Sequence, residues 1–315
     1  MAVALFAAVL LAPGGVASAA DVPRLPKYVS VLSWNMCGAW DGCTAWEKPA
    51  EKVGLVVEAV EDDPSVAVVM LQEVCRGLHA EPLQERLGEG WQVQFRAAPV
   101  VPRYEKGNLV GPTDRADDLH KVNLCSADKR NVPPGGPPTD EAGVLVAMKK
   151  LPGSELHGEN MSFVQDVRQG AACIKDTGNL LFACSSHFLN KVADPDEESR
   201  VRSGWNFRDQ TFHLQAQGYR TVIGGDLNAR PDTRPLQPLY EGNFEADVNL
   251  QRATHPEGKL DHVFFSDYGW DLVGASVDYP GTVEGLPGLF TLPRFGERLS
   301  DHSILKGVVE PVSGW

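Results

Sequence analysis

Positive charge is scarce in this sequence of 315 residues: 29 Lys and Arg oppose 42 Asp and Glu, which gives a formal net charge of −13. This balance excludes a protein that coats nucleic acid through bulk positive charge, so any phosphate must be met by local groups. The 31 Gly and 23 Pro are too few for a low-complexity chain. With 43% hydrophobic residues, the chain is expected to fold around a sizeable core.

A transmembrane segment is not expected, because the apolar run Ala2–Ala12 is shorter than the roughly 20 residues that a membrane-spanning helix needs. Pro13–Gly15 breaks this run, and Ala17–Ala19 offers small residues for cleavage. Residues 1–20 are therefore predicted to be a signal peptide, and the protein to be secreted. A buried N-terminal helix is the alternative.

C-x-x-C pairs, the hallmark of many zinc and redox sites, are absent, although the chain has six cysteines. Three disulfides are the simplest interpretation and agree with secretion. One pair follows from geometry, because two strands flank Gly178-Asn179 as a hairpin and counting outward from this turn places Cys173 opposite Cys184. Cys37 and Cys43 would close a short loop, and Cys75 with Cys125 is left by elimination.

Short β-branched runs alternate with stretches of helical periodicity, which predicts an α/β fold with sheets buried on at least one face. The predicted strands are Tyr28–Trp34, Val66–Leu71, Gly143–Met148, Leu180–Ser185, Thr221–Gly225 and His262–Phe265. The predicted helices are Pro49–Val60, Leu78–Leu87 and Glu197–Gln217. Residues 99–140, rich in Pro and Gly, are expected to form a long irregular excursion, and residues 28–310 are taken as one domain.

Polar residues follow or begin several of these strands, which is where a rigid scaffold presents reactive groups. They are Asn35, Glu73, His187, Asp226, Asn228, Asp261, Asp301 and His302. The group is rich in oxygen and free of thiolates, so it predicts a Mg²⁺ site, with Mn²⁺ or Ca²⁺ as alternatives to Mg²⁺, and not a zinc site.

Two spacings within this group suggest catalysis. Asp226 and Asn228 would lie on one face of an extended segment, where a carboxylate and an amide could converge on one phosphate. His302 follows Asp301 and could supply a base or a cation, provided that another carboxylate orients its far nitrogen. Each residue taken alone is also explained as a helix cap, a turn former or a satisfied polar group. Their order along the chain is what favours a site.

The ordered motifs resemble those of the endonuclease/exonuclease/phosphatase superfamily, which is deoxyribonuclease-I-like. They are Trp34-Asn35, Leu71-Gln72-Glu73, Ser186-His187-Phe188, Gly224-Gly-Asp-Leu-Asn228, Leu260-Asp261 and Ser300-Asp301-His302. The resemblance implies a four-layered α/β sandwich of two packed mixed β-sheets flanked by helices. It also places the site where strand ends of both sheets meet.

The resemblance further implies a role for each residue. Glu73 resembles the principal metal ligand, Asn35 the amide that supports it, and Asp301 a further ligand. The catalytic set would be Asp226, which orients or deprotonates water, Asn228, which holds a phosphoryl oxygen, His187, which donates to the phosphate, and an Asp261–His302 pair. This pair would either activate water or stabilise the charge on the pentacovalent phosphorus, as phosphodiester hydrolysis requires.

The sequence also offers candidates for contacts with the substrate. Arg230 follows the Asp-x-Asn motif, Arg168 lies before the hairpin, and Arg208 lies in a basic and aromatic segment that includes Trp205; all three arginines are candidates for gripping backbone phosphates. The alternative for the segment that contains Arg208 is an ordinary amphipathic helix whose arginines pair with Asp196, Glu197 and Glu198. His262 points to the face opposite Asp261 and is interpreted as structural.

These observations predict a secreted, divalent-metal-dependent phosphodiester hydrolase, a nuclease acting on DNA or RNA by in-line attack of water. It is expected to be a monomer. A sphingomyelinase-like lipid phosphodiesterase or a phosphatase acting on phosphomonoesters is the alternative, since the apolar loop Gly285–Phe295 could touch a membrane. A secreted binding module without turnover is the third interpretation.

Overall fold

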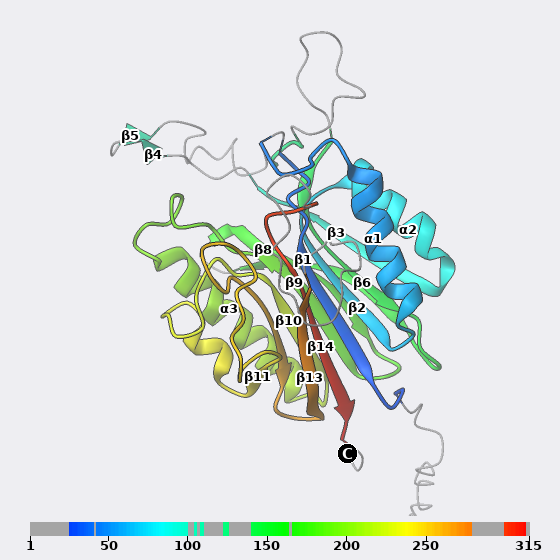
Figure 1. Ribbon diagram of the computed structural model, residues 1–315. Helices are drawn as coiled ribbons and strands as arrows, with labels where there is room; N and C mark the ends of the chain where they lie inside the picture. The colour runs from blue at the N-terminus through cyan, green and yellow to red at the C-terminus, as the bar shows by residue number, and fades with distance from the viewer. Residues whose placement is uncertain are drawn as a thin grey trace, which may run out of the picture.

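Two mixed six-stranded sheets pack face to face, and helices cover their outer faces (Figure 1). This is the four-layered α/β sandwich predicted from the sequence. The computed structural model describes residues 25–40, 42–99, 104–105, 108–109, 122–125, 140–163, 166–278 and 299–312. The predicted signal peptide and the loop Gly285–Phe295 lie outside the described residues, as does most of the excursion at 99–140.

The first sheet has the strand order β13-β14-β1-β2-β6-β3. Its strands are β1 (Val29–Asn35), β2 (Val66–Cys75), β3 (Trp91–Ala97), β6 (Ala142–Lys149), β13 (Trp270–Asp278) and β14 (Ile304–Pro311). The second sheet has the order β11-β12-β10-β9-β8-β7. Its strands are β7 (Leu156–Phe163), β8 (Asp166–Asp176), β9 (Leu181–His187), β10 (Arg220–Asp226), β11 (Asn243–Glu245) and β12 (Asp261–Ser266).

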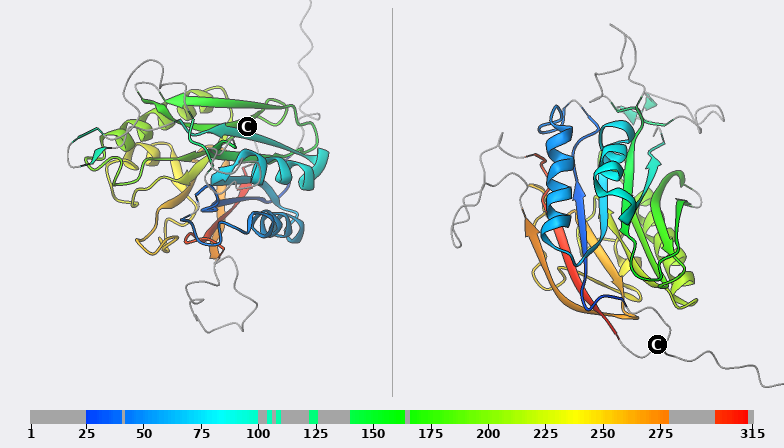
Figure 2. Two further views of the ribbon diagram at one scale, coloured as in Figure 1. Left: turned by 90° about the horizontal axis from the view of Figure 1, so that it is seen from above. Right: turned by 90° about the vertical axis from the view of Figure 1, so that its right-hand side faces the viewer.

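Three α-helices are described. Helices α1 (Pro49–Asp62) and α2 (Glu81–Leu87) lie side by side over the first sheet, and α3 (Glu198–Gln215) covers the second (Figure 2). Single helical turns occur at Arg76–Ala80, Gly88–Gly90 and Gln237–Tyr240, and a separate two-stranded ribbon joins β4 (Tyr104–Glu105) to β5 (Asn108–Leu109). Among the described helices, none is both long and apolar enough to cross a membrane.

Successive side chains of the buried strands face opposite sides of each sheet, which explains how the sheets and helices form layers. In β1, Val31 faces the core between the sheets, whereas Leu32 faces the layer beneath α1. Helix α1 turns Val53, Val56 and Val57 toward that layer, at the spacing that places apolar residues on one helix face. Each sheet is thus apolar on both faces, which leaves the strand ends as the place for polar groups.

All three predicted disulfides are present. Cys173 and Cys184 are directly opposite in the register of β8 and β9, with their Cα atoms 4.1 Å apart. The two other disulfides are Cys37–Cys43 and Cys75–Cys125. The hairpin register that the sequence predicted is therefore confirmed, although the turn spans the four residues 177–180.

A buried charged cluster at strands β11 and β12 of the second sheet predicts that the fold is sensitive to acid. Glu245 Oε1 lies 2.6 Å from Lys259 Nζ and 2.8 Å from His262 Nδ1. Burial alone would raise the pKa of Glu245, but His262 and Lys259 outweigh it and lower that pKa to about 2. A depressed carboxyl pKa stabilises the fold above the unfolded value and loses this contribution as pH falls toward the folded value.

We therefore expect the free energy of unfolding to fall between about pH 4.5 and pH 2, with Glu245 contributing on the order of 3 kcal/mol. Urea denaturation at several pH values measures this fall. The Glu245→Gln variant should be less stable at pH 7 and show a shallower acid decline. An equally steep decline in Glu245→Gln would show that this carboxylate does not carry the effect.

Candidate active site

Asn35, the last residue of β1, joins the two sheets. Its amide nitrogen donates to Glu73 Oε1 at 3.2 Å and to Asp226 Oδ2 at 3.0 Å, while its amide oxygen accepts from the backbone N–H of Cys37 at 2.9 Å. Glu73 belongs to the first sheet and Asp226 to the second. The buried amide thus separates two carboxylates, and its nitrogen, not its oxygen, faces them. The role of Asn35 in supporting a metal ligand stays a prediction.

Glu73 reaches the site because β2 is irregular at this point. The pairing of β2 with β6 shifts between Leu71 and Val74, and Glu73 has the left-handed backbone angle φ of 51°. A bulge of this kind re-aims a side chain that a regular strand would direct elsewhere. The Glu73 side chain keeps 19% of its surface exposed, so a cation from solvent can reach it.

Three strands of the second sheet bring their ends into one row. Asp226 at the end of β10 is paired with His187 of β9 on one side and with Asp261 of β12 on the other. His187 Nε2 lies 3.4 Å from Asp226 Oδ2 and 3.8 Å from Glu73 Oε1. The register of the sheet therefore places a histidine between the carboxylates of the two sheets.

His302 completes the cluster from the segment before β14. Its Nδ1 lies 2.7 Å from Asp261 Oδ2, and its Nε2 lies 3.7 Å from Asp226 Oδ2. The Ser300 hydroxyl donates to the carbonyl of Asn35 and accepts from the backbone N–H of His302, which ties this segment to the end of β1. The predicted Asp261–His302 pair is present in the structure.

The charges of the cluster are mutually dependent. Burial lowers the pKa of His302, but Asp261 and Asp226 outweigh it and raise that pKa to about 10. Burial raises the pKa of Asp226, but His302 and His187 outweigh it and hold that pKa well below its usual range. Without a metal ion, the site at neutral pH therefore pairs an Asp226 carboxylate with a His302 imidazolium.

Asn228 does not lie as the sequence predicted. Strand β10 ends at Asp226, and Asn228 has φ of 47°, so the two side chains do not share the face of an extended segment. The backbone N–H of Asn228 donates to Asp226 Oδ1 at 2.9 Å, and its amide nitrogen donates to the carbonyl of Phe188 at 3.0 Å. This turn fixes the Asp226 carboxylate. The phosphate-binding role of Asn228 stays a prediction.

The arginines have different surroundings. Arg230 donates to the carbonyl of Glu257, in the loop before β12. Arg208 lies in α3, where its guanidinium forms ion pairs with Asp209 and Glu241 and not with the acids that the helix alternative named. Arg168 lies in β8, and its side chain is outside the described residues. Their roles in substrate binding stay predictions.

Sequence reasoning missed three residues at or beside the site. His255 approaches Asp301, with Nε2 3.6 Å from Oδ2, and its ring lies 4.6 Å from that of His302. The Pro256-Glu257-Gly258 turn signal shortly before Asp261 is the one hint of this approach. Lys52 and Trp40 are the others. Burial lowers the pKa of Lys52 to about 8, although Asp301 and Glu73 oppose this shift.

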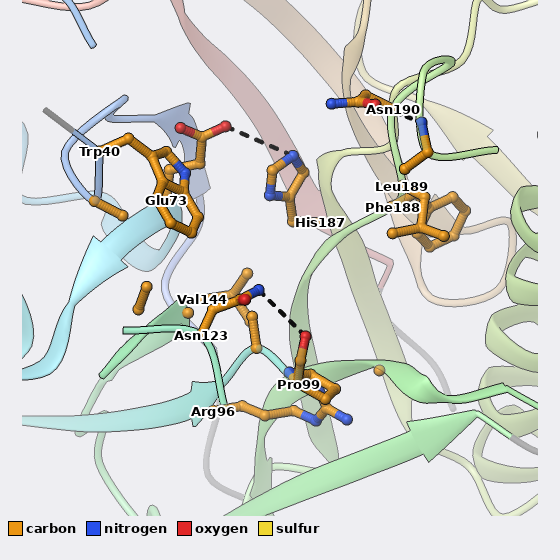
Figure 3. Close-up of a pocket in the computed structure, with 16 residues that line it drawn as sticks. Trp40, Glu73, Arg96, Pro99, Asn123, Val144, His187, Phe188, Leu189 and Asn190 are labelled. Atoms are coloured by element: carbon orange, nitrogen blue, oxygen red, sulfur yellow. Dashed lines mark hydrogen bonds and ion pairs between the residues drawn. The ribbon is translucent and has the colours of Figure 1, made fainter. Parts of the chain in front are cut away.

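A pocket of about 260 Å³ opens beside Glu73 and His187 (Figure 3). Its wall includes Trp40, Arg96, Pro99, Asn123, Phe188 and Asn190. In the close-up, Glu73 and His187 point toward one another at one end of the pocket. A flat group attached to a phosphate at these two residues would therefore have an aromatic surface within reach.

The residues present fit a hard divalent cation. Glu73 and Asp301 offer carboxylate oxygens, and no cysteine thiolate is available because all six cysteines form disulfides. Oxygen ligands of this kind suit Mg²⁺ or Mn²⁺. Glu73 is the best placed of them, because it is partly exposed and held by Asn35.

The chain matches the sequence model of the Endonuclease/Exonuclease/phosphatase family over residues 32–302. It belongs to this family. Family members are hydrolases that act on phosphoester bonds. The matched span runs from β1 to His302 and so contains every residue of the cluster described above. No curated protein sequence matches the chain.

Solved structures with the family fold align over nearly the whole chain. The human Nocturnin catalytic domain has 16% identity and a TM-score of 0.59, with 91% of this chain and 94% of that chain covered. Truncated Caenorhabditis elegans TDP2 has 15% identity and a TM-score of 0.57, with 90% and 97% covered. D. rerio TDP2 complexed with single strand DNA product has 12% identity and a TM-score of 0.58, with 90% and 100% covered.

Proposed function

We propose that this family member is a secreted, divalent-metal-dependent phosphodiester hydrolase that cleaves nucleic acid. The bridge from Asn35 to Glu73 and Asp226 carries the proposal, because it joins a cation ligand of one sheet to an acid–base cluster of the other. A bound Mg²⁺ would supply Lewis-acid stabilisation of the phosphate charge. Glu73 would hold this ion, with Asp301 as a further ligand.

The chain's own residues would divide the remaining chemistry. Asp226 stays ionised and would orient or deprotonate the attacking water. His302, kept as an imidazolium by Asp261 and Asp226, would stabilise the charge that develops on phosphorus. Of the two roles that the resemblance allowed for this pair, a protonated imidazole favours charge stabilisation. His187 would donate to a phosphate oxygen.

Nucleic acid is the substrate class that the pocket favours. The exposed ring of Trp40, in the pocket beside Glu73 and His187, suits a base, because every base offers a flat face for stacking. The likeness to D. rerio TDP2 complexed with single strand DNA product is in accord with this choice. The three disulfides and the predicted signal peptide support secretion.

The test is hydrolysis of supercoiled plasmid, single-stranded DNA and RNA by the purified protein with Mg²⁺, compared with sphingomyelin micelles and p-nitrophenyl phosphate. We expect cleavage of at least one nucleic acid, abolished by a chelator and restored by Mg²⁺ or Mn²⁺. Cleavage of sphingomyelin alone would favour the lipid alternative. Absence of turnover on every substrate would favour a binding module.

Trp40 offers a finer test of the substrate class. Its side chain is 37% exposed at the pocket. We expect Trp40→Ala to raise KM for single-stranded nucleic acid by roughly tenfold, because stacking on one base contributes about 1–3 kcal/mol, and to leave kcat nearly unchanged. Trp205, 45% exposed on α3, provides the matched control Trp205→Ala. A larger increase in KM for Trp205→Ala would indicate that the substrate binds over α3 instead.

A further inference from the structure

Residues 36–40 and 42–44 form a segment that follows β1 on the way to α1 and is tied to the site by its backbone. The N–H of Met36 donates to the carbonyl of Gln72 at 3.0 Å, and the N–H of Gly38 donates to the carbonyl of Glu73 at 2.9 Å. Between them, the N–H of Cys37 donates to Asn35 Oδ1. Three backbone N–H groups of this segment are therefore bonded to Asn35, Gln72 and Glu73.

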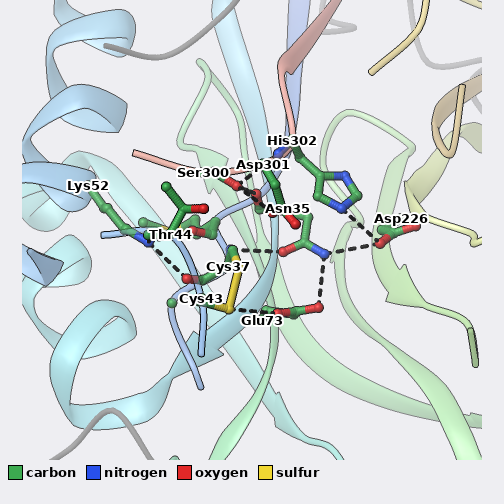
Figure 4. Close-up of a disulfide and its surroundings, with 12 residues drawn as sticks. Asn35, Cys37, Cys43, Thr44, Lys52, Glu73, Asp226, Ser300, Asp301 and His302 are labelled. Carbon is green, nitrogen blue, oxygen red and sulfur yellow. Dashed lines mark hydrogen bonds and ion pairs between the residues drawn. A yellow bond between two sulfur atoms is a disulfide. The ribbon is translucent and has the colours of Figure 1, made fainter. Parts of the chain in front are cut away.

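The Cys37–Cys43 disulfide closes this segment beside the metal-binding carboxylate. The Cys43 sulfur lies 3.5 Å from Glu73 Oε2 (Figure 4). A disulfide sulfur carries no hydrogen, so this is a packing contact that limits where the carboxylate can move. Cys37 has φ of 45°, a backbone conformation that a non-glycine residue keeps only when its surroundings impose it.

Lys52 of α1 forms hydrogen bonds with the same segment. Its side chain is fully buried, and its ammonium group donates to the carbonyls of Met36 at 2.8 Å, Cys37 at 2.8 Å and Thr44 at 2.9 Å. All three donors of the ammonium group are thus used on the two ends of the loop. Burying an ammonium group is costly unless it is hydrogen-bonded, and these three carbonyls supply the acceptors.

We propose that the Cys37–Cys43 disulfide and Lys52 are positioning groups that set the metal affinity of Glu73 through Asn35. The inference rests on the metal site of the proposed function. With the loop closed, the Cys37 N–H holds the amide oxygen, so the amide nitrogen must face Glu73 and Asp226. With the loop open, the amide can turn, and two like-charged carboxylates lose the donor between them. Groups that orient a ligand in this way typically contribute 10–100-fold to metal affinity.

The test is Mn²⁺ binding to the metal-free full chain, measured by isothermal titration calorimetry alongside thermal unfolding. We expect Cys37→Ser/Cys43→Ser to weaken binding about 10–100-fold. Lys52→Met keeps the side-chain length without the donors and should weaken binding to a similar extent. Excess Mn²⁺ should restore nuclease activity to the Cys37→Ser/Cys43→Ser variant.

The chain provides a matched control in its second sheet. Cys173→Ala/Cys184→Ala removes a fully buried disulfide that packs under α3, and should lower the melting temperature without changing Mn²⁺ affinity. Unchanged affinity in Cys37→Ser/Cys43→Ser, with normal binding by the wild type, would overturn the positioning role alone. Equal loss of affinity in both double variants would overturn it as well. A wild type that binds no Mn²⁺ would overturn the metal site itself.

Discussion

Replacing Glu73 by Gln is expected to lower the rate of plasmid cleavage at saturating Mg²⁺ by about a thousandfold or more. The substitution keeps the shape of the side chain and the contact with the Cys43 sulfur, but it removes the charge of the best-placed cation ligand. It also leaves Asn35 facing an amide in place of a carboxylate. Loss of metal-assisted charge stabilisation at the transition state affects kcat more than substrate binding.

The measurement is the nicking rate of supercoiled plasmid over a range of Mg²⁺ concentrations. Glu58→Gln is the matched control, because Glu58 is exposed on α1 and its replacement removes the same charge far from any cluster. We expect Glu58→Gln to cleave at the wild-type rate. If Glu73→Gln nicks plasmid at the wild-type rate, the assignment of Glu73 as the metal ligand is wrong.

Replacing His302 by Asn is expected to lower kcat by about 10²–10⁴-fold, the usual contribution of a positioned acid–base group. His302 is held from both ring nitrogens, by Asp261 at 2.7 Å and by Asp226 at 3.7 Å. Asn retains a donor toward Asp261 but cannot carry the positive charge. Mg²⁺ affinity should change much less than kcat, which separates this variant from Glu73→Gln.

Steady-state cleavage of a fluorescent oligonucleotide gives kcat and KM for this comparison, and calorimetry gives the Mg²⁺ affinity. His213→Asn serves as the control, because His213 is exposed near the end of α3. A His302→Asn variant with wild-type kcat would show that the Asp261–His302 pair is structural. Loss of Mg²⁺ binding in this variant would instead indicate that the cation site includes His302 and lies closer to the second sheet.

The central strands could be predicted because their apolar runs are continuous. All six predicted strands are confirmed within a few residues, since strands buried on both faces need no polar alternation. The four edge strands β3, β7, β11 and β13 were missed, as was β14 beside β13. β7, for example, is mostly exposed and carries few apolar residues, so nothing distinguished it from a loop.

The strand ends were sufficient to predict most of the cluster. His187, Asp226 and Asp261 end or begin buried strands, and the pairing of β9, β10 and β12 then places them in one row. The sequence could not supply that register. Nor could it show the bulge that re-aims Glu73, because a bulge depends on the partner strand β6.

Local backbone geometry explains the remaining differences. The expectation for Asn228 assumed that the strand continues past Asp226, and the left-handed backbone at Asn228 makes it wrong. Lys52 and His255 contact residues that share no motif with them, so apart from the turn after His255 no sequence signal marks them. His262, by contrast, was correctly interpreted as structural, because it bonds Glu245 and the carbonyl of Ala229 inside the core.

The most direct measurement is a crystal structure of the protein soaked in Mn²⁺, with anomalous diffraction to locate the ion. We predict an anomalous peak about 2 Å from a carboxylate oxygen of Glu73, with the Asn35 amide nitrogen still facing Glu73 and Asp226. An ion bound elsewhere while Glu73 stays without a ligand would contradict this prediction. So would the absence of any peak at this carboxylate under saturating Mn²⁺.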